Sequence, residues 1–459
     1  MEEIETKIEN EKKGCGGDGL LYFLVVLLGT GALLIYNAII TPVNFWSYTM
    51  PDYNVLFYIS FSYNAPQLIV LFIMMKWGEK WNLNKRVWIT LLILIAGVVV
   101  IPLIPTTINN QTDALVLVII TTMVLGIANG ILSGSIFSLS ASLGGDFSVA
   151  AMIGNGIAGI LMELIRIITQ AAMNSDDQII AGTIIYFVLA GVVLICCLVG
   201  FEVIRCIPKA HRTIVMMHGK IRGGQNSNDY IPFDESVGEE QNISPPVQET
   251  TAGLITEEVG DIIGQVMPED VESKGSKDVL GDDEDIIGAG NEEPRSNGEI
   301  LKSIWVDCLS IFFVFFITLA LFPGVTNMVT PASSMDPDWF GIWNMSCFMV
   351  GDMVGRSLPQ LVVLWGRKTN IVVVFARLIF YPLIILQVEE VLHSDLLLYI
   401  TMLLFSATNG YTSTLAMMYG PTQVEKKDKP QAGVLMTVFL NSGLFGGSLL
   451  ALGLNPLLS

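Results

Sequence analysis

Apolar residues run along most of this chain in long stretches that short polar segments separate. Eleven stretches hold about 20 or more mainly apolar residues, which is the length that a helix needs to cross the hydrocarbon core of a bilayer. They cover residues 20–41, 55–75, 87–107, 114–142, 147–173, 179–205, 304–325, 337–364, 370–389, 395–419 and 431–458. The pattern therefore predicts an all-α membrane protein with eleven transmembrane helices.

The Lys and Arg residues of the connections are confined to one alternating set of these connections. Basic residues follow the second, sixth, eighth and tenth stretches, within 76–86, 205–222, 367–368 and 426–429. The alternate connections, at 42–54, 106–113, 174–178, 326–336 and 390–394, contain none. Because short cytosolic loops are enriched in Lys and Arg, the N-terminus is predicted to be cytosolic and Ser459 to lie outside. We expect a multi-pass protein of the plasma membrane.

The negative charge of the chain is concentrated in one connection. Of 459 residues, 52% are hydrophobic and only 15% charged, which excludes a single soluble domain, yet the formal net charge is −19. Residues 223–303 hold 20 acidic and 4 basic residues and are rich in Gly, Ser, Asn and Pro. This composition predicts a disordered segment. Such an acidic balance also argues against a nucleic-acid partner.

These features divide the chain into four predicted parts. A cytosolic tail covers 1–19, a bundle of six helices 20–205, an acidic disordered cytosolic loop 206–303, and a bundle of five helices 304–459. The loop is interpreted either as a solvated spacer or as a regulatory segment, and its basic start is expected to lie against anionic lipid. Two halves of this kind, divided by a long loop, are typical of transporters whose halves rock around a central site.

The sequence contains no arrangement of residues typical of an enzyme. Its 3 histidines and 6 cysteines are scattered without metal-ligand spacing, and no cysteine falls in an outside connection. Gly219-Lys220 lacks the preceding glycine of a phosphate-binding loop. We therefore predict that the protein is not an enzyme and that it uses no metal or other cofactor.

Several charged residues lie inside the predicted helices, where each costs about 3 kcal/mol at the bilayer centre. Asp352 and Arg356 are four residues apart and share a helix face, Glu163 and Arg166 are three apart, and Arg377 lies in the ninth stretch. One interpretation is that internal ion pairs fasten the bundle. The other is that Asp352 and Arg356 line a water-filled pathway, because a carboxylate beside a guanidinium offers acceptors and donors to a neutral, hydroxyl-rich solute.

Several segments resemble the equilibrative nucleoside transporter family. The segment 133–137 followed by 152–159 is similar to the family's Gly-Ser-x-Phe and Gly-Gln/Asn-Gly-x-x-Gly motifs, and 352–356 is similar to its D-x-x-G-R signature. Further matches lie at 322–326, 409–411, 417–421, 432–433, 439–440 and 443–444. The resemblance covers essentially every predicted helix in the same order, including the long loop after the sixth.

The resemblance implies a major-facilitator fold and the passage of nucleosides, with nucleobases and purines among the candidate substrates, by alternating access without ATP. By position, Asp352 and Arg356 would hold the ribose hydroxyls, and Asn155 would hydrogen-bond the edge of the base. The wall of the site would include Tyr36, Leu33 and Ile40 from the first helix, Asn64 and Gln67 from the second, and Leu444 from the eleventh.

This sequence departs from the family's pattern at three places. The family's Pro-Trp-Asn in the first helix is Ile35-Tyr36-Asn37 here, and an Asn common three residues before the Asp of the eighth helix is Met349. Asn64 and Gln67 stand where animal members tend to carry apolar residues. The departures bear on substrate preference and inhibitor sensitivity, and the polar pair could add hydrogen bonds to the base.

The sequence leaves two other functions and the mode of coupling open. The chain could be a carrier of sugars or other small neutral metabolites, or a non-transporting receptor or scaffold that works through its acidic loop. The expected partners are the substrate, the lipid bilayer, and a regulatory partner of the loop. Transport could be equilibrative or coupled to protons, with Asp352, Glu163 and Asp146 as candidate carboxylates.

Overall fold

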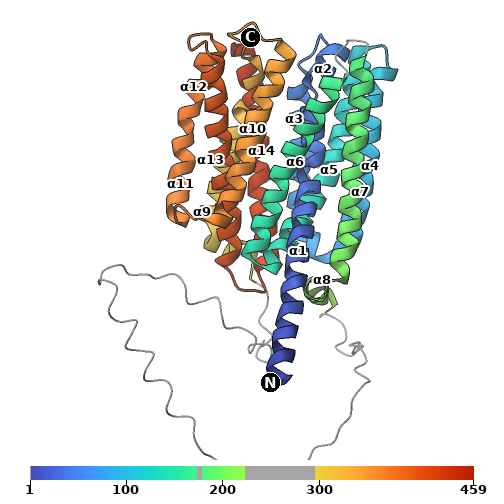
Figure 1. Ribbon diagram of the computed structural model, residues 1–459, viewed down its shortest axis with the longest axis vertical. Helices are drawn as coiled ribbons and strands as arrows, with labels where there is room; N and C mark the ends of the chain where they lie inside the picture. The colour runs from blue at the N-terminus through green and yellow to red at the C-terminus, as the bar shows by residue number, and fades with distance from the viewer. Residues whose placement is uncertain (1, 173–177, 223–294, 459) are drawn as a thin grey trace, which may run out of the picture. The chain divides into compact units, whose positions relative to one another are not determined.

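The computed structural model describes residues 2–172, 178–222 and 295–458, and these residues are almost entirely helical, with no strand in these ranges. They belong to one unit, in which helices from both halves of the sequence run side by side (Figure 1). Of the loop predicted to be disordered, 206–303, residues 223–294 lie outside the described residues, whereas its two described ends are helical, from Pro208 to Arg222 and from Asn297 onward.

The helices before the acidic segment are called here the N-terminal helices. They are α1 (Glu2–Ile40), the short α2 (Val43–Thr49), α3 (Val55–Trp77), the 3-10 turn η1 (Gly78–Lys80), α4 (Leu83–Thr107), α5 (Gln111–Leu143), α6 (Gly145–Ala172), α7 (Ile179–Cys206) and α8 (Pro208–Arg222).

The helices after the acidic segment are called the C-terminal helices. They are α9 (Asn297–Leu321), the 3-10 turn η3 (Thr326–Met328), α10 (Pro337–Leu361), α11 (Arg367–Ala376), the 3-10 turn η4 (Arg377–Ile379), α12 (Phe380–Val388), α13 (Asp395–Thr422) and α14 (Lys429–Leu458). The ninth predicted stretch is thus two helices joined by a tight turn.

Nine helical segments in the described ranges are long and apolar enough to cross a membrane, and each coincides with a predicted stretch. The two remaining stretches correspond to α10 and α13, which are helices of 25 and 28 residues but fall short of the same apolarity. These helices carry the buried polar side chains of Asp352, Arg356 and Asn409. Their lower apolarity therefore reflects polar groups that face the protein interior.

Polar side chains mark the start of several helices. Asn82 caps α4 and Asn110 caps α5 by accepting backbone N–H groups, and Asp336 does the same for α10. At α9, Ser296 and Glu299 form a capping box. Each cap satisfies donors that the helix itself cannot pair and contributes about 1 kcal/mol, so these residues fix where the helices begin.

Glycine residues allow pairs of helices to pack closely. The main pairs are α1 with α6, α3 with α5, α9 with α14, and α10 with α13. Gly355 of α10 lies against the backbone of α13, and Gly410 of α13 lies against the backbone of α10. Gly154 of α6 lies against the α1 backbone at Val26. Small residues at such interfaces are typical of helices packed in membranes.

The N-terminal and C-terminal helices meet along two seams. In the first seam α14 packs against α3 and α5, and in the second α6 packs against α10 and α13. Each seam joins segments that are far apart in the sequence. The space that the helices enclose between these seams holds the candidate site described below.

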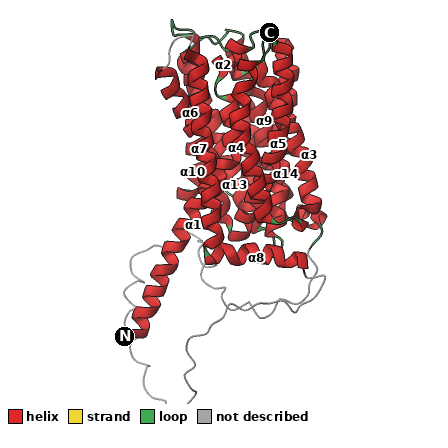
Figure 2. Cartoon of the chain, turned by 90° about the vertical axis from the view of Figure 1, so that its right-hand side faces the viewer, coloured by secondary structure: helices red, strands yellow, loops and turns green. Residues whose placement is uncertain are grey.

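The N-terminus and the C-terminus lie at opposite ends of the helices (Figure 1). Near the N-terminal end, α8 runs across the ends of the long helices instead of alongside them (Figure 2). The Lys209 ammonium contacts the Asp18 carboxylate at 3.1 Å and links α8 to α1.

Candidate functional site

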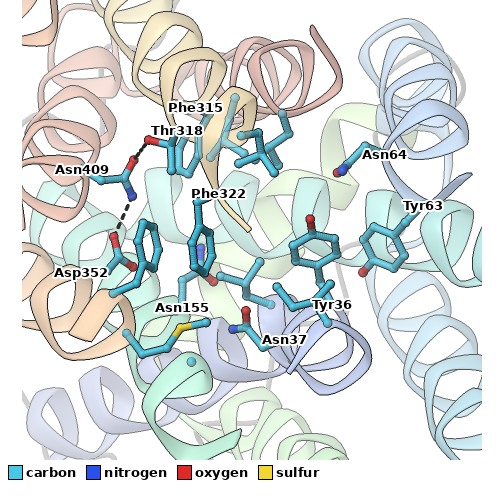
Figure 3. Close-up of a pocket in the computed structure, with 18 of the residues that line it drawn as sticks. Tyr36, Asn37, Tyr63, Asn64, Asn155, Phe315, Thr318, Phe322, Asp352 and Asn409 are labelled. Atoms are coloured by element: carbon cyan, nitrogen blue, oxygen red, sulfur yellow. Dashed lines mark hydrogen bonds between the residues drawn. The ribbon is translucent and has the colours of Figure 1, made fainter. Parts of the chain in front are cut away.

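A cavity of about 80 Å³ is lined by residues of both the N-terminal and the C-terminal helices (Figure 3). Eight helices contribute to its wall. The lining residues are Leu33, Tyr36, Asn37 and Ile40 of α1, Tyr63, Asn64 and Gln67 of α3, Asn129 of α5, Asn155 and Gly159 of α6, Phe315, Thr318 and Leu319 of α9 with Phe322 just after it, Phe348, Met349, Asp352 and Arg356 of α10, Asn409 of α13, and Leu440 and Leu444 of α14.

All nine residues that the sequence singled out for the substrate site line this one cavity. They are Leu33, Tyr36, Ile40, Asn64, Gln67, Asn155, Asp352, Arg356 and Leu444. The fold brings them together from five helices spread over some 400 residues of sequence. That each of them contacts a substrate stays a prediction. Asp146, one of the candidate proton carboxylates, lies in the first turn of α6 and does not line the cavity.

The charged end of the cavity is formed by Asp352 and Arg356, which are 6% and 2% exposed. The Arg356 Nε donates to Asp352 Oδ2 at 2.6 Å, so the expected contact between these residues is formed. Asn409 Nδ2 donates to Asp352 Oδ1 at 2.7 Å, and Thr318 Oγ1 donates to Asn409 Oδ1 at the same distance (Figure 3). The ion pair therefore both fastens the interior and forms part of the cavity wall. It presents no net charge.

Two tyrosines form the opposite end of the cavity. The rings of Tyr36 and Tyr63 lie 5.2 Å apart between centroids, and the Tyr36 hydroxyl lies 3.2 Å from Ser60 Oγ. Asn64 Nδ2 donates to the Ser60 carbonyl of its own helix at 2.8 Å. Asn64 is thus bonded within its own helix, whereas Gln67 Oε1 has no hydrogen-bond partner.

Five polar atoms on the cavity wall are buried and have no hydrogen-bond partner. They are Asn37 Nδ2, Tyr63 OH, Gln67 Oε1, Asn129 Oδ1 and Asn155 Oδ1. Buried polar groups are paired in the large majority of cases, and an unpaired one costs about 1–3 kcal/mol. All five lie on the N-terminal helices and are available to hydrogen-bond a polar ligand.

Aromatic rings line the cavity between the charged end and the tyrosine end (Figure 3). The rings of Phe322 and Phe348 are stacked, with centroids 3.7 Å apart and planes 5° from parallel. Phe315 adds a third ring to the same wall. A flat heterocyclic ligand could pack against the outer faces or edges of these rings, since aromatic pairs favour offset-stacked and edge-to-face contacts.

Glu163 and Arg166 do not form the ion pair that their spacing had suggested, so that interpretation is wrong. No ion pair joins the two in the described part of the chain. Arg166 donates to Gln170 Oε1 at 2.7 Å and to Asn44 Oδ1 of α2. Glu163 Oε1 instead accepts from Ser346 Oγ of α10 at 3.1 Å, across the second seam. The carboxylate therefore links N-terminal and C-terminal helices.

Sequence reasoning missed several polar residues of the site, chiefly Asn37, Tyr63, Asn129, Thr318 and Asn409. Three of them, Asn37, Asn129 and Asn409, are amides inside apolar stretches. An amide in such a stretch is costly unless it finds a partner, so this signal could have marked all three. Nothing in the sequence says which of the many polar residues within helices share one cavity.

A buried polar cavity enclosed by two groups of membrane-length helices defines a membrane solute carrier. The same fold occurs in a proton:xylose symporter of the major facilitator superfamily, XylE, with a TM-score of 0.56 and 9% identity over 94% of this chain and 88% of that chain. A nucleoside transporter family model matches residues 117–455. The chain belongs to the nucleoside transporter family, which is a family of carriers and not of enzymes.

Relatives from plants, protozoa and animals match over most of the chain. The equilibrative nucleotide transporter 8 of Arabidopsis thaliana is 23% identical over 94% of this chain and 93% of that protein. The adenosine transporter 1 of Crithidia fasciculata is 26% identical over 88% and 82%, and the human equilibrative nucleoside transporter 1 is 27% identical over 80% and 73%. The family resemblance seen in the sequence is thereby confirmed, and the chain is an integral membrane protein.

Proposed function

We propose that this protein carries nucleosides across the membrane by alternating access, with the central cavity as the substrate site and without ATP. The observation that best supports this is the distribution of polar groups in the cavity. A charged pair, Asp352 and Arg356, lies at one end, and unpartnered amide groups lie elsewhere on the wall, with aromatic rings between. A nucleoside has the same division, because its hydroxyls are on the ribose and its remaining donors and acceptors are on a flat base.

The ribose would lie at the charged end. Asp352 would accept hydrogen bonds from the vicinal hydroxyls, and Arg356 would donate to an oxygen from one of its remaining N–H groups. The base would lie against Tyr36 and the phenylalanine rings, with Asn155 and Gln67 at its polar edge. The apolar side chains that would exclude water around it are Leu33, Ile40 and Leu444. A free nucleobase would lack the ribose contacts and bind more weakly.

Alternating access is supported by the size of the cavity and by the contacts that close it. About 80 Å³ is well below the roughly 300–1,000 Å³ of small-molecule sites, so the cavity must widen to admit a nucleoside. The two seams would open in turn at either end while the site stays between them. The hydrogen bond from Ser346 to Glu163 crosses the second seam and would break when that seam parts.

We further propose that all eleven predicted stretches cross the plasma membrane, with the N-terminus in the cytosol and the C-terminus outside. Support comes from the nine apolar segments, from α10 and α13 beside them, and from the basic residues of α8 at the N-terminal end. Helix ends rich in Lys and Arg favour the cytosolic side. The acidic loop would then be cytosolic, where a regulatory partner could reach it.

Expression in cells that lack nucleoside uptake tests the proposed function. We expect saturable uptake of labelled adenosine and uridine that excess unlabelled inosine reduces and excess xylose does not, because only a nucleoside matches both ends of the cavity. Measuring initial rates with each competitor gives the result. Competition by xylose without competition by inosine would instead identify a carrier of sugars or similar metabolites.

The same assay decides whether protons are co-transported. Uptake is measured with an inward proton gradient, and again after a protonophore has dissipated that gradient. Equal rates would identify an equilibrative carrier, since passive flux needs only the moving helices. Rates that depend on the gradient would identify proton coupling, with Glu163 and Asp352 as the carboxylates in or beside the pathway.

Asn155→Ala is expected to change which base is preferred more than how fast transport runs. Its unpartnered Oδ1 lies on the cavity wall, and losing one hydrogen bond to a ligand changes relative affinities by about 5–10-fold. The ratio of purine to pyrimidine nucleoside uptake measures this. Asn441→Ala is a matched control, because Asn441 is also a buried amide but does not line the cavity. Equal ratios in Asn155→Ala and the unmodified protein would contradict the role of Asn155.

A further inference from the structure

Arg377 is a buried cation that the proposed binding mode does not use. It lies at the start of η4, is 2% exposed and is not among the residues that line the cavity. A buried guanidinium usually lies against a carboxylate. None of the ion pairs in the described part of the chain includes Arg377. Some other arrangement must therefore hold this charge in the interior.

Neutral oxygens and one aromatic ring hold the guanidinium. Nη1 donates to the Val314 carbonyl at 2.9 Å, and Nε donates to Thr408 Oγ1 at 3.2 Å. Nη2 donates to Thr318 Oγ1 at 2.7 Å. The guanidinium carbon lies 5.0 Å from the centre of the Phe405 ring. Of these partners only Thr318 lines the cavity, so it is the point where Arg377 reaches the site.

The hydrogen bonds beyond Thr318 run in one direction to Asp352. Because a guanidinium can only donate, the Thr318 oxygen accepts from Arg377. The single hydrogen of the Thr318 hydroxyl has two acceptors within reach, Asn409 Oδ1 and the Val314 carbonyl, and Asn409 is the nearer. Asn409 Oδ1 accepts that hydrogen at 2.7 Å, and Asn409 Nδ2 donates to Asp352 Oδ1 at 2.7 Å. An ionised carboxylate can only accept. The donor at one end of this series of hydrogen bonds and the acceptor at the other are thus fixed. Hydrogen bonds that follow one another in this way strengthen each other.

We propose that Arg377 is a positioning residue for the ribose end of the site, and that it acts through Thr318 and Asn409 to hold the Asp352 carboxylate in place for the hydroxyls. This inference rests on the proposed nucleoside transport. Asn409 occupies Oδ1 and Arg356 occupies Oδ2 of the carboxylate. Each oxygen keeps a further acceptor position for a ligand hydroxyl.

Loss of Arg377 would remove the first hydrogen bond of this series, the one to Thr318. The Thr318 hydroxyl has a second acceptor in its own helix, the Val314 carbonyl at 2.8 Å, to which it could then turn. Asn409 would lose the donor that orients its amide. The amide would then be held only by its bond to Asp352, so Asn409 could shift and the carboxylate with it. The charge of Asp352 would remain, but its alignment with the ribose would not.

The test compares adenosine with 2′,3′-dideoxyadenosine, which lacks both hydroxyls, by measuring the Kd of each for the purified full-length protein. Arg377→Gln and Thr318→Val should each weaken adenosine binding about tenfold, the size of one lost hydrogen bond to a charged group. Binding of 2′,3′-dideoxyadenosine should change less than about twofold. Thr318→Ser keeps the hydroxyl, so it should bind adenosine more tightly than Thr318→Val does. A purely structural role would weaken both ligands alike.

Two further variants make the comparison specific. The double variant Arg377→Gln with Thr318→Val should lose no more adenosine affinity than either single variant, because both break the same chain. Thr412→Val is a matched control, since the hydroxyl of Thr412 donates to carbonyls of its own helix at 2.6 Å and 3.5 Å and lies outside the cavity. It should leave the ratio of the two Kd values unchanged.

Several outcomes would overturn this role. One is a ratio of the two Kd values in Thr318→Val equal to that of the unmodified protein. Another is an equal loss of affinity for both ligands in Arg377→Gln. A third is a loss of adenosine affinity in the double variant equal to the sum of the losses in the two single variants. If Arg377→Gln does not fold, the Thr318→Val and Thr318→Ser pair still decides. Failure of the unmodified protein to bind adenosine would refute the proposed function itself, which is a different result from unchanged ratios in a protein that binds it.

Discussion

Asp352→Asn is expected to reduce nucleoside uptake by about 100-fold or more for each protein molecule at the cell surface. The substitution keeps the shape of the side chain but removes the charge that faces Arg356, which is 2% exposed. Breaking a buried, hydrogen-bonded charge pair costs about 2–5 kcal/mol, and each 1.4 kcal/mol corresponds to about tenfold in affinity. Arg356→Ala removes the other partner and should have a similar effect.

Initial rates of adenosine uptake, divided by the amount of protein labelled at the surface, measure this effect. Asp307→Asn provides the control, because Asp307 is also a buried carboxylate, with its Oδ2 2.6 Å from Arg367 Nε, but it does not line the cavity. That variant can lower the amount of folded protein, yet its uptake per surface molecule should be kept. Normal uptake by both Asp352→Asn and Arg356→Ala would remove the ribose-binding role of the pair.

Gly410→Ala is expected to destabilise the protein strongly, although alanine favours helix over glycine by about 1 kcal/mol. A Cβ at this position would overlap the Asp352 carbonyl oxygen and lie 2.8 Å from the Arg356 backbone nitrogen. Backbone atoms cannot move aside as a flexible side chain can, so α10 and α13 would have to separate. Overpacking of this kind costs about 1–3 kcal/mol or more.

Thermal unfolding of the purified protein should show the effect as a fall in Tm of roughly 1–3 °C. Gly341→Ala is the matched control, because Gly341 also lies within a helix, α10, and an added Cβ there meets nothing within 4 Å. That variant should keep or slightly raise the Tm. Equal Tm values for the two variants would contradict the close contact between α10 and α13 at Gly410.

The positions of the helices followed from the sequence because membrane-length apolar stretches are a local property. Two details did not follow. The first helix begins at Glu2 and not near residue 20, since the polar residues before the apolar stretch continue the same helix. The ninth stretch divides at Arg377 into α11 and α12. Neither detail changes how many apolar residues each stretch contains, so the pattern of apolar residues alone could not predict them.

The charged pairs show where local spacing suffices and where it fails. Asp352 and Arg356 meet as their four-residue spacing predicted, because one helix face places both side chains together. Glu163 and Arg166 have spacing that would also permit contact. Arg166 instead binds Asn44 of α2, and Glu163 binds Ser346 of α10. Partners from other helices decided the outcome, and the sequence around residue 163 does not specify them.

The sequence by itself determined that this is an all-helical membrane protein with its negative charge in one loop, that it belongs to the nucleoside transporter family, and which nine residues to examine. Those properties depend on composition, on local spacing and on motifs. Only the tertiary structure decided that Asn37, Tyr63, Asn129 and Asn409 share the cavity with them and that Arg377 reaches Asp352 through two neutral residues. The physical reason is that helix packing sets how each helix is rotated about its axis, and this rotation decides which side chains meet.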